Sequence, residues 1–347
     1  MIETLLEKPT QWLDASGPQA AFVINTRASL SRNFLDLPFP ARCGDEELAS
    51  SEQRSLALLR KLDEFSRGAY YPLGQLDPKE VQLLEERQLL RDRFSRRVQG
   101  RGIYVSNEQA VSALLNDADH LRLQVLASGV QLHETWEHLS AMDDRASAHA
   151  EFAYDERLGY LTSSLGLTGT ALRVTVLCHL PGLSLTKRIH EIERLLIEDH
   201  FTLMGYLGAL DQAHGDLYEI TNQATLGWSE EEMLYHAQTL IDQIIERERE
   251  ARRAFLSEGS RGIEDRVGRA IGVAREARLL SLDEALDLLS SLRLGVESGL
   301  LTGYSYRQLN EILVTTQQAH LDMAREGERD ALTGNMERAD HFRVSFS

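Results

Sequence analysis

The sequence predicts an α+β fold in which helices pack against one sheet and an all-α region follows toward the C-terminus. From about residue 101 to residue 221, short β-rich or alternating runs bounded by turn residues indicate strands. Helical stretches separate some of these runs, without the regular alternation that is typical of a parallel sheet. After residues 259–262 the strand signals stop. We therefore expect a domain boundary near residue 258, with one domain over 1–258 and a helical one over 259–347.

The elements follow in order along the chain. The first 20 residues have an amphipathic pattern, and charged, leucine-bearing stretches at 52–66 and 77–95 predict helices with a break at 70–74 between them. Strand-like runs then lie at 101–105, 121–126, 159–162, 172–180 and 216–221, and helical stretches lie near 130–148, 186–199 and 229–256. The C-terminal helices are predicted at 263–280, 281–291, 293–301 and 305–325, with Ser281 and Asp283 in an N-cap region.

Composition and charge exclude several classes of protein. The 347 residues suffice for two medium domains, and 42% apolar with 26% charged residues is typical of a soluble globular chain. The net charge of −17 disfavours binding to nucleic acid and to anionic membranes, which are polyanions. No signal pattern and no run of about 18 apolar residues occurs, so no membrane span is expected. Cys43 and Cys178 cannot build a disulfide framework and suit a reducing cytosol, so we expect a cytoplasmic protein. The 11 histidines show no Cys-x-x-Cys or His-Glu-x-x-His spacing, so we expect no metal site.

Three arginines have unusual surroundings. Arg27 follows the apolar run 22–24, Arg122 begins one predicted strand, and Arg173 begins another. Arginines on a sheet face are costly unless they meet anions, and their forked donors match phosphate oxygens. An ion pair or a surface position is the commoner role of an arginine, and the residues alone leave both roles open. The phosphate-binding loop of P-loop proteins and the glycine pattern of dinucleotide-binding domains are both absent from the sequence.

The segment 246–253 is dense in charge, with the sequence Glu-Arg-Glu-Arg-Glu-Ala-Arg-Arg. Alternating opposite charges are typical of a solvated helix face with ion pairs, and we favour this interpretation over a binding patch.

Several motifs resemble those of the phosphagen kinases and of the McsB-type bacterial protein arginine kinases, which transfer the γ-phosphoryl of ATP to a guanidinium. Residues 159–173 match, without a gap, the family's Gly-Tyr-Leu-Thr-Ser-Cys-Pro-Thr-Asn-x-Gly-Thr-x-x-Arg. Further segments resemble Ser-Ser-Arg-x-Arg-x-x-Arg-Asn (25–33), Asn-Glu-Glu-Asp-His-x-Arg (116–122), His-Leu-Pro (179–181), Gln-Ile-Ser-Asn-Gln-x-Thr-Leu-Gly (219–227) and Val-Arg-Leu-Gly-Ile (292–296).

The resemblance extends along nearly the whole chain and implies a fold. For residues 1–258 it implies the guanidino kinase catalytic fold, an antiparallel sheet flanked by helices. Residues 259–347 resemble the McsB dimerisation and phosphoarginine-sensing domain, which phosphagen kinases lack. The resemblance therefore favours the protein arginine kinases and implies a homodimer.

The resemblance also implies a nucleotide site, and this chain departs from it. Of the five family arginines around the ATP phosphates, three match here, as Arg27, Arg122 and Arg173. Ser29 stands at the position of a fourth, and Met204 stands where an arginine opens the family's Arg-Gly-x-x-Gly-Glu loop. The site is thus expected to lose two positive charges that would face the triphosphate.

Both carboxylates that the resemblance places in the reaction are replaced. Ala118 stands where the family glutamate aligns the guanidinium and takes its proton, and Ala209 stands where a second glutamate assists. General-base help is typically worth about 10²–10⁴-fold in rate. Asp117 is a shorter substitute, and on a strand it would point to the face opposite Ala118. The family's loop cysteine and asparagine are Ser164 and Leu167.

The family's phosphoarginine sensor, Arg-Asp-x-x-Arg-Ala, is incomplete here. Arg338-Ala339 matches its second half, but Gly334-Asn335 stands in place of Arg-Asp. Alternatively Arg329-Asp330 matches its first half, and Thr333-Gly334 then replaces Arg-Ala.

We therefore expect a pseudokinase of the protein arginine kinase type, which binds ATP and Mg weakly or not at all and acts through protein contacts. The resemblance implies an McsA-like adaptor, the Clp machinery or an active kinase paralogue as partners. Two alternatives stay open: an active protein arginine kinase, and a purely structural homodimer subunit.

Overall fold

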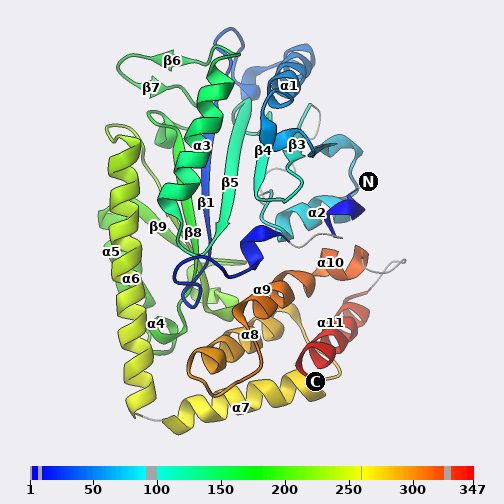
Figure 1. Cartoon of the computed structure of the whole chain (residues 1–347), viewed down its shortest axis with the longest axis vertical. Coiled ribbons are helices and arrows are strands. Elements are labelled where there is room, and N and C mark those ends of the chain that lie inside the picture. The colour runs from blue at the N-terminus through cyan, green and yellow to red at the C-terminus, as the bar shows by residue number, and fades with distance from the viewer. Residues whose placement is uncertain (1, 7–9, 91–99, 259, 324–329) are drawn as a thin grey trace.

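One large antiparallel sheet lies at the centre of the protein (Figure 1). The computed structural model describes residues 2–6, 10–90, 100–258, 260–323 and 330–347. The eight strands pair in the order β2-β3-β4-β5-β1-β8-β10-β9, and every pairing is antiparallel. Their bounds are β1 Val23–Arg32, β2 Ala69–Pro72, β3 Gly102–Val105, β4 Val111–Leu115, β5 Leu121–Ser128, β8 Leu172–His179, β9 Phe201–Gly205 and β10 Leu217–Asn222. A separate small hairpin pairs β6 (Tyr154–Asp155) with β7 (Gly159–Tyr160).

Helices α3 and α6 cover one face of this sheet, and the C-terminal helices lie at one end of the molecule (Figure 1). The sheet-containing part carries α1 Asp45–Leu59, α2 Pro78–Glu86, α3 Leu132–Ser147, α4 Pro181–Leu185, α5 Ile189–Glu198 and α6 Glu230–Glu258. The C-terminal part contains α7 Ser260–Glu276, α8 Leu282–Glu297, α9 Tyr306–Thr315, α10 Gln318–Met323 and α11 Ala331–Phe346, and no strand within its described residues. The predicted α+β fold with an all-α C-terminal part is confirmed. None of the helices in the described ranges is long and apolar enough to cross a membrane.

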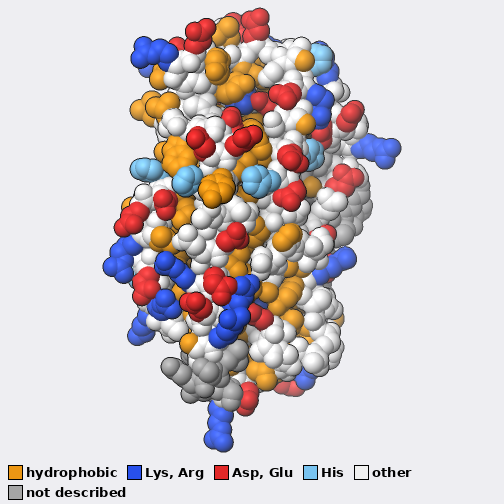
Figure 2. All heavy atoms as spheres, turned by 60° about the vertical axis from the view of Figure 1, so that its left-hand side comes forward, with side chains coloured by type: hydrophobic (Ala, Val, Ile, Leu, Met, Phe, Trp, Pro, Cys, Tyr) orange, Lys and Arg blue, Asp and Glu red, His pale blue; other side chains and the backbone are white. Residues whose placement is uncertain are grey.

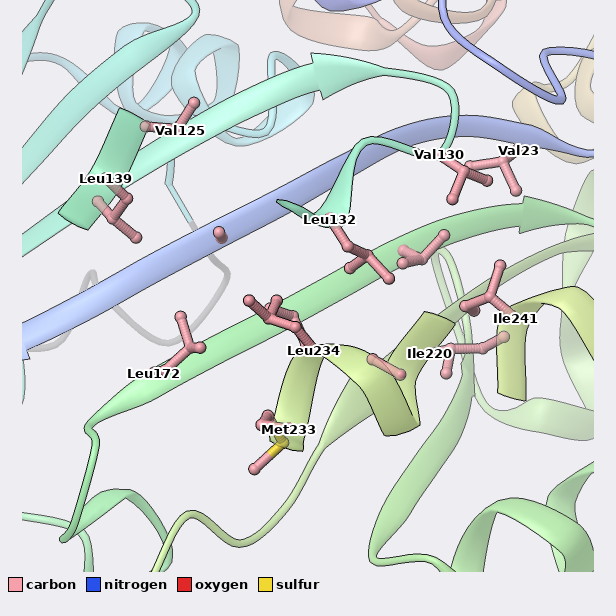
Figure 3. Packing of buried hydrophobic residues seen from close by; sticks show 14 of the residues in the cluster. Val23, Val125, Val130, Leu132, Leu139, Leu172, Ile220, Met233, Leu234 and Ile241 are labelled. Atoms are coloured by element: carbon pink, nitrogen blue, oxygen red, sulfur yellow. The ribbon is translucent and has the colours of Figure 1, made fainter. Parts of the chain in front are cut away.

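The main core lies between the sheet and the long helices α3 and α6 (Figure 3). Alternate residues of each strand point into it, as Leu121, Leu123 and Val125 of β5 do. Figure 3 shows Leu139 of α3 and Leu234 of α6 meeting these strands from the helix side. Because side chains alternate along a strand, the residues between these core positions face the opposite side of the sheet.

A second core joins that opposite side to the C-terminal helices. Ile24, Leu126 and Leu177, near the ends of three neighbouring strands, pack together with buried residues of α7, α8, α9 and α11. Trp12, which is completely buried, also belongs to this core. The C-terminal helices therefore cover one end of the second sheet face and leave its middle to polar side chains.

Some predicted elements were wrong. Residues 70–74 are not a simple break, because Ala69–Pro72 forms edge strand β2, where the missing N–H of Pro72 costs little. Residues 281–291 and 293–301 are not two helices but mainly the single helix α8, since no helix breaker separates them. The stretch 305–325 is divided between α9 and α10. The predicted N-cap at Ser281 is confirmed, because its side chain accepts from the backbone N–H of Glu284.

Other elements were not predicted. Strands β1, β4 and β9 and helix α11 had not been assigned from the sequence. Residues 91–95 of the predicted helix 77–95 and residues 324–325 of the predicted helix 305–325 lie outside the described residues. The proposed boundary at residue 258 stays a prediction.

The charged segment 246–253 is only partly a solvated face. Acidic, basic and apolar side chains are intermixed over α6 on the outer face (Figure 2). Glu248, however, is completely buried, and its carboxylate accepts from the backbone N–H groups of Gly182 (2.8 Å) and Leu183 (2.9 Å). The buried Arg252 donates to Glu248 and to the carbonyl of His179. This pair fastens α4 and the end of β8 to α6, so the prediction of a wholly solvated face was wrong.

Removing the Glu248 carboxylate should therefore destabilise the protein strongly. Glu248→Ala leaves the buried Arg252 without one partner and two N–H groups of α4 unsatisfied, at an expected cost of about 3 kcal/mol. Equilibrium urea denaturation would measure the loss. The matched control is Glu250→Ala, an exposed position on the same helix that should stay within about 0.5 kcal/mol of the wild type. A loss of the same size for both variants would contradict this account of Glu248.

Candidate active site

The three arginines singled out from the sequence share the second face of the sheet. Arg27 lies on β1, Arg122 on β5 and Arg173 on β8, and these strands are neighbours in the order β5-β1-β8. Ser29 of β1 pairs with Arg173, and Ser31 of β1 pairs with Arg122. All three arginines alternate with residues of the main core, so their side chains leave the sheet on its polar side. The structure thus brings together the residues that the sequence had placed in one site.

Two of these arginines meet carboxylates of their own chain. Arg122 Nη1 lies 2.8 Å from Asp117 Oδ2. Arg27 is buried, with Nη2 3.5 Å from Glu219 Oε1 and Nη1 donating to the carbonyl of Gln88 at 3.4 Å. Glu219 projects from β10, two strands away from β1. The polar face therefore contains acids as well as bases.

The carboxylate of Asp117 comes from a bend and not from a strand. Residues 116–120 connect β4 to β5, and the strand geometry assumed for Asp117 and Ala118 was wrong. Asp117 consequently faces the site and pairs with Arg122. Ala118 is exposed beside it and carries only a methyl group.

Asn116 fixes the start of this bend. Its backbone has a φ of 53°, in the left-handed region that asparagine tolerates better than most residues. Its side-chain oxygen accepts from Ser51 (2.7 Å), and its side-chain nitrogen donates to the carbonyls of Leu48 (2.9 Å) and Gly100 (2.6 Å). The side chain is completely buried, so these bonds satisfy an amide that water cannot reach.

Asp119 fixes the end of the bend. Its Oδ1 accepts from Asn33 Nδ2 and from the backbone N–H of Ser163, both at 2.7 Å. Ser163 Oγ in turn donates to the carbonyl of Ala118 at 2.6 Å. The bend is therefore held in place by residues on both sides, whatever side chain occupies position 118.

His120 is also a structural residue. It is completely buried, and its Nδ1 accepts from the backbone N–H of Phe34 at 3.2 Å. Burial lowers the pKa of His120 to about 4, so the ring is neutral near pH 7. A neutral ring whose Nδ1 is already engaged cannot replace a general base at the surface of the site.

Comparison with known proteins identifies the family. Residues 50–251 match the family model described as "ATP:guanido phosphotransferase, C-terminal catalytic domain", and residues 260–347 match "Protein-arginine kinase McsB C-terminal domain". A protein named "Protein-arginine kinase" from Symbiobacterium thermophilum is 36% identical over 99% of this chain and 99% of its own length. The chain belongs to the protein-arginine kinase family of ATP:guanido phosphotransferases.

Other relatives agree with this assignment. The "Protein-arginine kinase" of Moorella thermoacetica is 35% identical over 96% of each chain. Among solved structures, the crystal structure of lombricine kinase is 25% identical, with a TM-score of 0.59 over 70% of this chain and 71% of that one. The likeness to a guanidino kinase outside the protein-arginine branch agrees with the sheet described above.

In this family member the loop after β9 also lacks its expected charges. Met204, at the position of a family arginine, is 55% exposed, and Ala209, at the position of the second family glutamate, is exposed as well. Between them, burial raises the pKa of the Tyr206 phenol, which faces the side-chain amides of Gln317 and Gln88. Tyr206 also packs against the core of the C-terminal helices, so the loop contacts that part of the chain.

The remaining substitutions lie around the same face. Ser29 is buried on β1 between Arg173 and Gln124. Ser164 is exposed, whereas Leu167 is buried. Ser29 therefore does not replace the charge of the family arginine, and Ser164 and Leu167 are uncharged as well.

The sequence analysis missed Glu219. The signal was present in the segment 219–227, where the quoted family pattern begins with Gln and this chain has Glu. A single added carboxylate acquires meaning only when the strand order brings β10 close to β1: Glu219 is level with Asn25 across β8, and Arg27 reaches it diagonally.

The residues at the positions of the phosphoarginine sensor motif form contacts within the C-terminal part of the chain. Arg338 is buried and donates to the carbonyls of Thr316 (2.8 Å) and Leu280 (2.9 Å). A Cβ on Gly334 would lie 2.8 Å from the side-chain oxygen of Gln318, so an arginine there would require that side chain to shift. In the alternative alignment Asp330 caps α11 by accepting from the N–H of Thr333, and Arg329 lies outside the described residues.

A histidine links the loop after β9 to α5 in a way that depends on pH. His190 Nε2 lies 2.9 Å from Asp211 Oδ1 in that loop, and Nδ1 lies 3.0 Å from Glu193 Oε2. The hydrogen bond to Glu193 and the charge of Asp211 raise the pKa of His190 above its ordinary 6.5. Since the folded-state pKa is raised, the contact is present below the ordinary pKa and is lost as pH rises through the raised one.

Removing one acid should shift this titration. In Asp211→Asn the pKa of His190, followed by NMR, should fall toward the ordinary value. The protection factors of the loop amides, which correct hydrogen exchange for its intrinsic pH dependence, should no longer change with pH in this range. Glu198→Gln, an exposed position of α5, is the matched control and should change neither quantity. An unchanged His190 titration in Asp211→Asn would contradict the contact.

Proposed function

We propose that this chain is a catalytically impaired protein-arginine kinase, which binds Mg-ATP weakly or not at all and acts through protein contacts in protein quality control. The observation that carries the proposal is the pairing of Arg122 with Asp117 and of Arg27 with Glu219. These carboxylates place negative charge where the resemblance puts the phosphates of ATP.

The charge balance of the polar face supports weak nucleotide binding. Asp117 and Glu219 offset the positive charges of Arg122 and Arg27, and Ser29 and Met204 add none. A triphosphate would have to displace Asp117 and Glu219 from their partners and then lie beside them. Two like charges about 4 Å apart repel by about 4 kcal/mol even at an effective dielectric constant of 20. The site therefore fits an Mg-ATP complex poorly.

The remaining acids do not compensate for Ala118 and Ala209. Asp119 is buried and engaged by Asn33 and Ser163. Asp117 would have to leave Arg122 before it could orient a guanidinium. Phosphoryl transfer to a weak nucleophile depends on positioning and charge neutralisation, and both are reduced in this face.

An active kinase is the second candidate, and one observation favours it. Relatives at 32–36% identity over nearly the whole chain carry the name "Protein-arginine kinase". Under this interpretation Asp117 would release Arg122 when a nucleotide arrives and would take the role of the missing glutamate.

For partners, the family membership supports proteins of the quality-control machinery: an McsA-like adaptor, the Clp machinery or an active kinase paralogue. We place the protein in the cytoplasm as a homodimer formed through the C-terminal helices. A purely structural dimer subunit would share this assembly and differ by showing no thermal response to ATP or phosphoarginine.

A phosphorylation assay separates the two main candidates. Incubation with Mg-ATP and an arginine-rich protein should give no acid-labile phosphoarginine above background, because no positioned base is available. A bona fide protein-arginine kinase run in parallel serves as the positive control. Turnover that disappears in Arg173→Ala would overturn the proposal, since it would have to arise in this site.

Removing the two internal acids should strengthen nucleotide binding. In Asp117→Asn with Glu219→Gln, both arginines keep a hydrogen-bonding neighbour but lose the competing charge. We expect the affinity for Mg-ATP to rise about tenfold or more, which corresponds to about 1.4 kcal/mol. The measurement is the ATP-dependent rise in melting temperature, which should be small or absent in the wild type.

The matched control replaces two exposed acids away from the polar face, in Glu151→Gln with Asp155→Asn. It makes the same change in net charge and should leave the thermal response unchanged. An equal gain in both double variants would attribute the effect to overall charge and not to the ion pairs.

A further inference from the structure

A second concave site lies away from the polar sheet face. A cavity of about 290 Å³ opens where α4, the C-terminal half of α6, the start of α7 and the end of α8 meet. Its apolar wall comes from Phe22, Leu185, Ile263 and Leu294. Phe22 and Leu185 precede the proposed domain boundary, whereas Ile263 and Leu294 follow it. The cavity is therefore built from both parts of the chain.

Two arginines of α6 frame the Phe22 ring. The guanidinium carbon of Arg252 lies 4.4 Å from the ring centroid, and that of Arg249 lies 5.1 Å from it. Both already have acidic partners, since Arg252 pairs with Glu248 and Arg249 pairs with Glu246. These two cations are therefore part of the wall.

Arg253 is different. It lies at the rim of the same cavity and is exposed. Among the residues that the structure describes, no carboxylate lies within ion-pair distance of its guanidinium. The lining also contains the carboxylate of Glu297, which pairs with Arg252. A largely apolar cavity with its carboxylate paired and one further cation at its rim is complementary to a molecule that has an apolar body and one negative charge.

We propose that this cavity binds a small organic anion, with an aromatic or aliphatic body of about a dozen non-hydrogen atoms and one carboxylate. The size follows from the volume, because an apolar cavity of about 150 Å³ accommodates benzene. The body lies against Phe22 and Leu294, and the carboxylate meets Arg253. A ligand in this position contacts both parts of the chain and so stabilises the packing of the C-terminal helices against the sheet-containing part.

The test uses 2-naphthoate as the probe and the full chain as the protein. Isothermal titration calorimetry should show one site per chain with a roughly millimolar or tighter dissociation constant. Arg253→Gln should weaken 2-naphthoate binding about tenfold but leave binding of the uncharged 2-naphthamide unchanged. The matched control is Arg60→Gln, which changes an exposed arginine directly after α1, outside the cavity lining. This variant should bind 2-naphthoate like the wild type.

A cavity-filling variant makes the location testable. Ser298→Phe places a ring at the half-exposed rim and should abolish binding of both probes. An unchanged melting temperature of this variant without ligand shows that it folds, and Leu185→Phe serves in its place if it does not. Absence of saturable 2-naphthoate binding to the wild type would overturn the proposal. Binding of 2-naphthoate to Arg253→Gln and to Ser298→Phe as tight as to the wild type would overturn it as well. Because Asp117 and Glu219 lie outside this cavity, the result is independent of the nucleotide experiments.

Discussion

Buried and half-buried arginines on the second face of the sheet impose the main constraint on this protein. Alternation along the strands puts Leu121 and Leu123 into the core and necessarily turns Arg122 to the other side. A guanidinium in such a place requires anions, because an unpaired buried charge costs several kcal/mol. In an ATP-using relative a nucleotide can supply the anions for part of the time. Here Asp117 and Glu219 supply them for Arg122 and Arg27.

The same face explains how the two parts of the chain depend on each other. At one end the strands expose Ile24 and Leu177, which the C-terminal helices cover. Polar contacts cross the same boundary, since Arg252 of α6 binds the carbonyl at the end of β8 and also pairs with Glu297 of α8. The loop after β9 meets this junction through Tyr206.

Local patterns sufficed to predict β5, β8 and the long helices α3 and α6, because each has a clear apolar period. Strand β1 was not predicted, since Asn25, Arg27 and Ser29 interrupt its pattern with residues that serve the polar face. The motifs placed Arg27, Arg122 and Arg173 together correctly. They could not show the ion pairs, because the contact of Arg27 with Glu219 depends on strand order and the contact of Asp117 with Arg122 depends on a bend. The burial of Glu248 was missed for a similar reason, as its partners are backbone groups of α4.

The bend before β5 shows why matching most of a motif is weak support for activity. Asn116, Asp119 and His120 each form buried hydrogen bonds that define the path of the backbone. Their loss would leave polar groups unsatisfied, at about 1–3 kcal/mol each, whether or not the protein catalyses a reaction. The side chain at position 118 forms no such hydrogen bond. Only the backbone carbonyl of this position accepts one, from Ser163, and any residue provides that carbonyl. Stability alone can therefore maintain Asn116, Asp119 and His120, so their presence does not indicate whether the site is active.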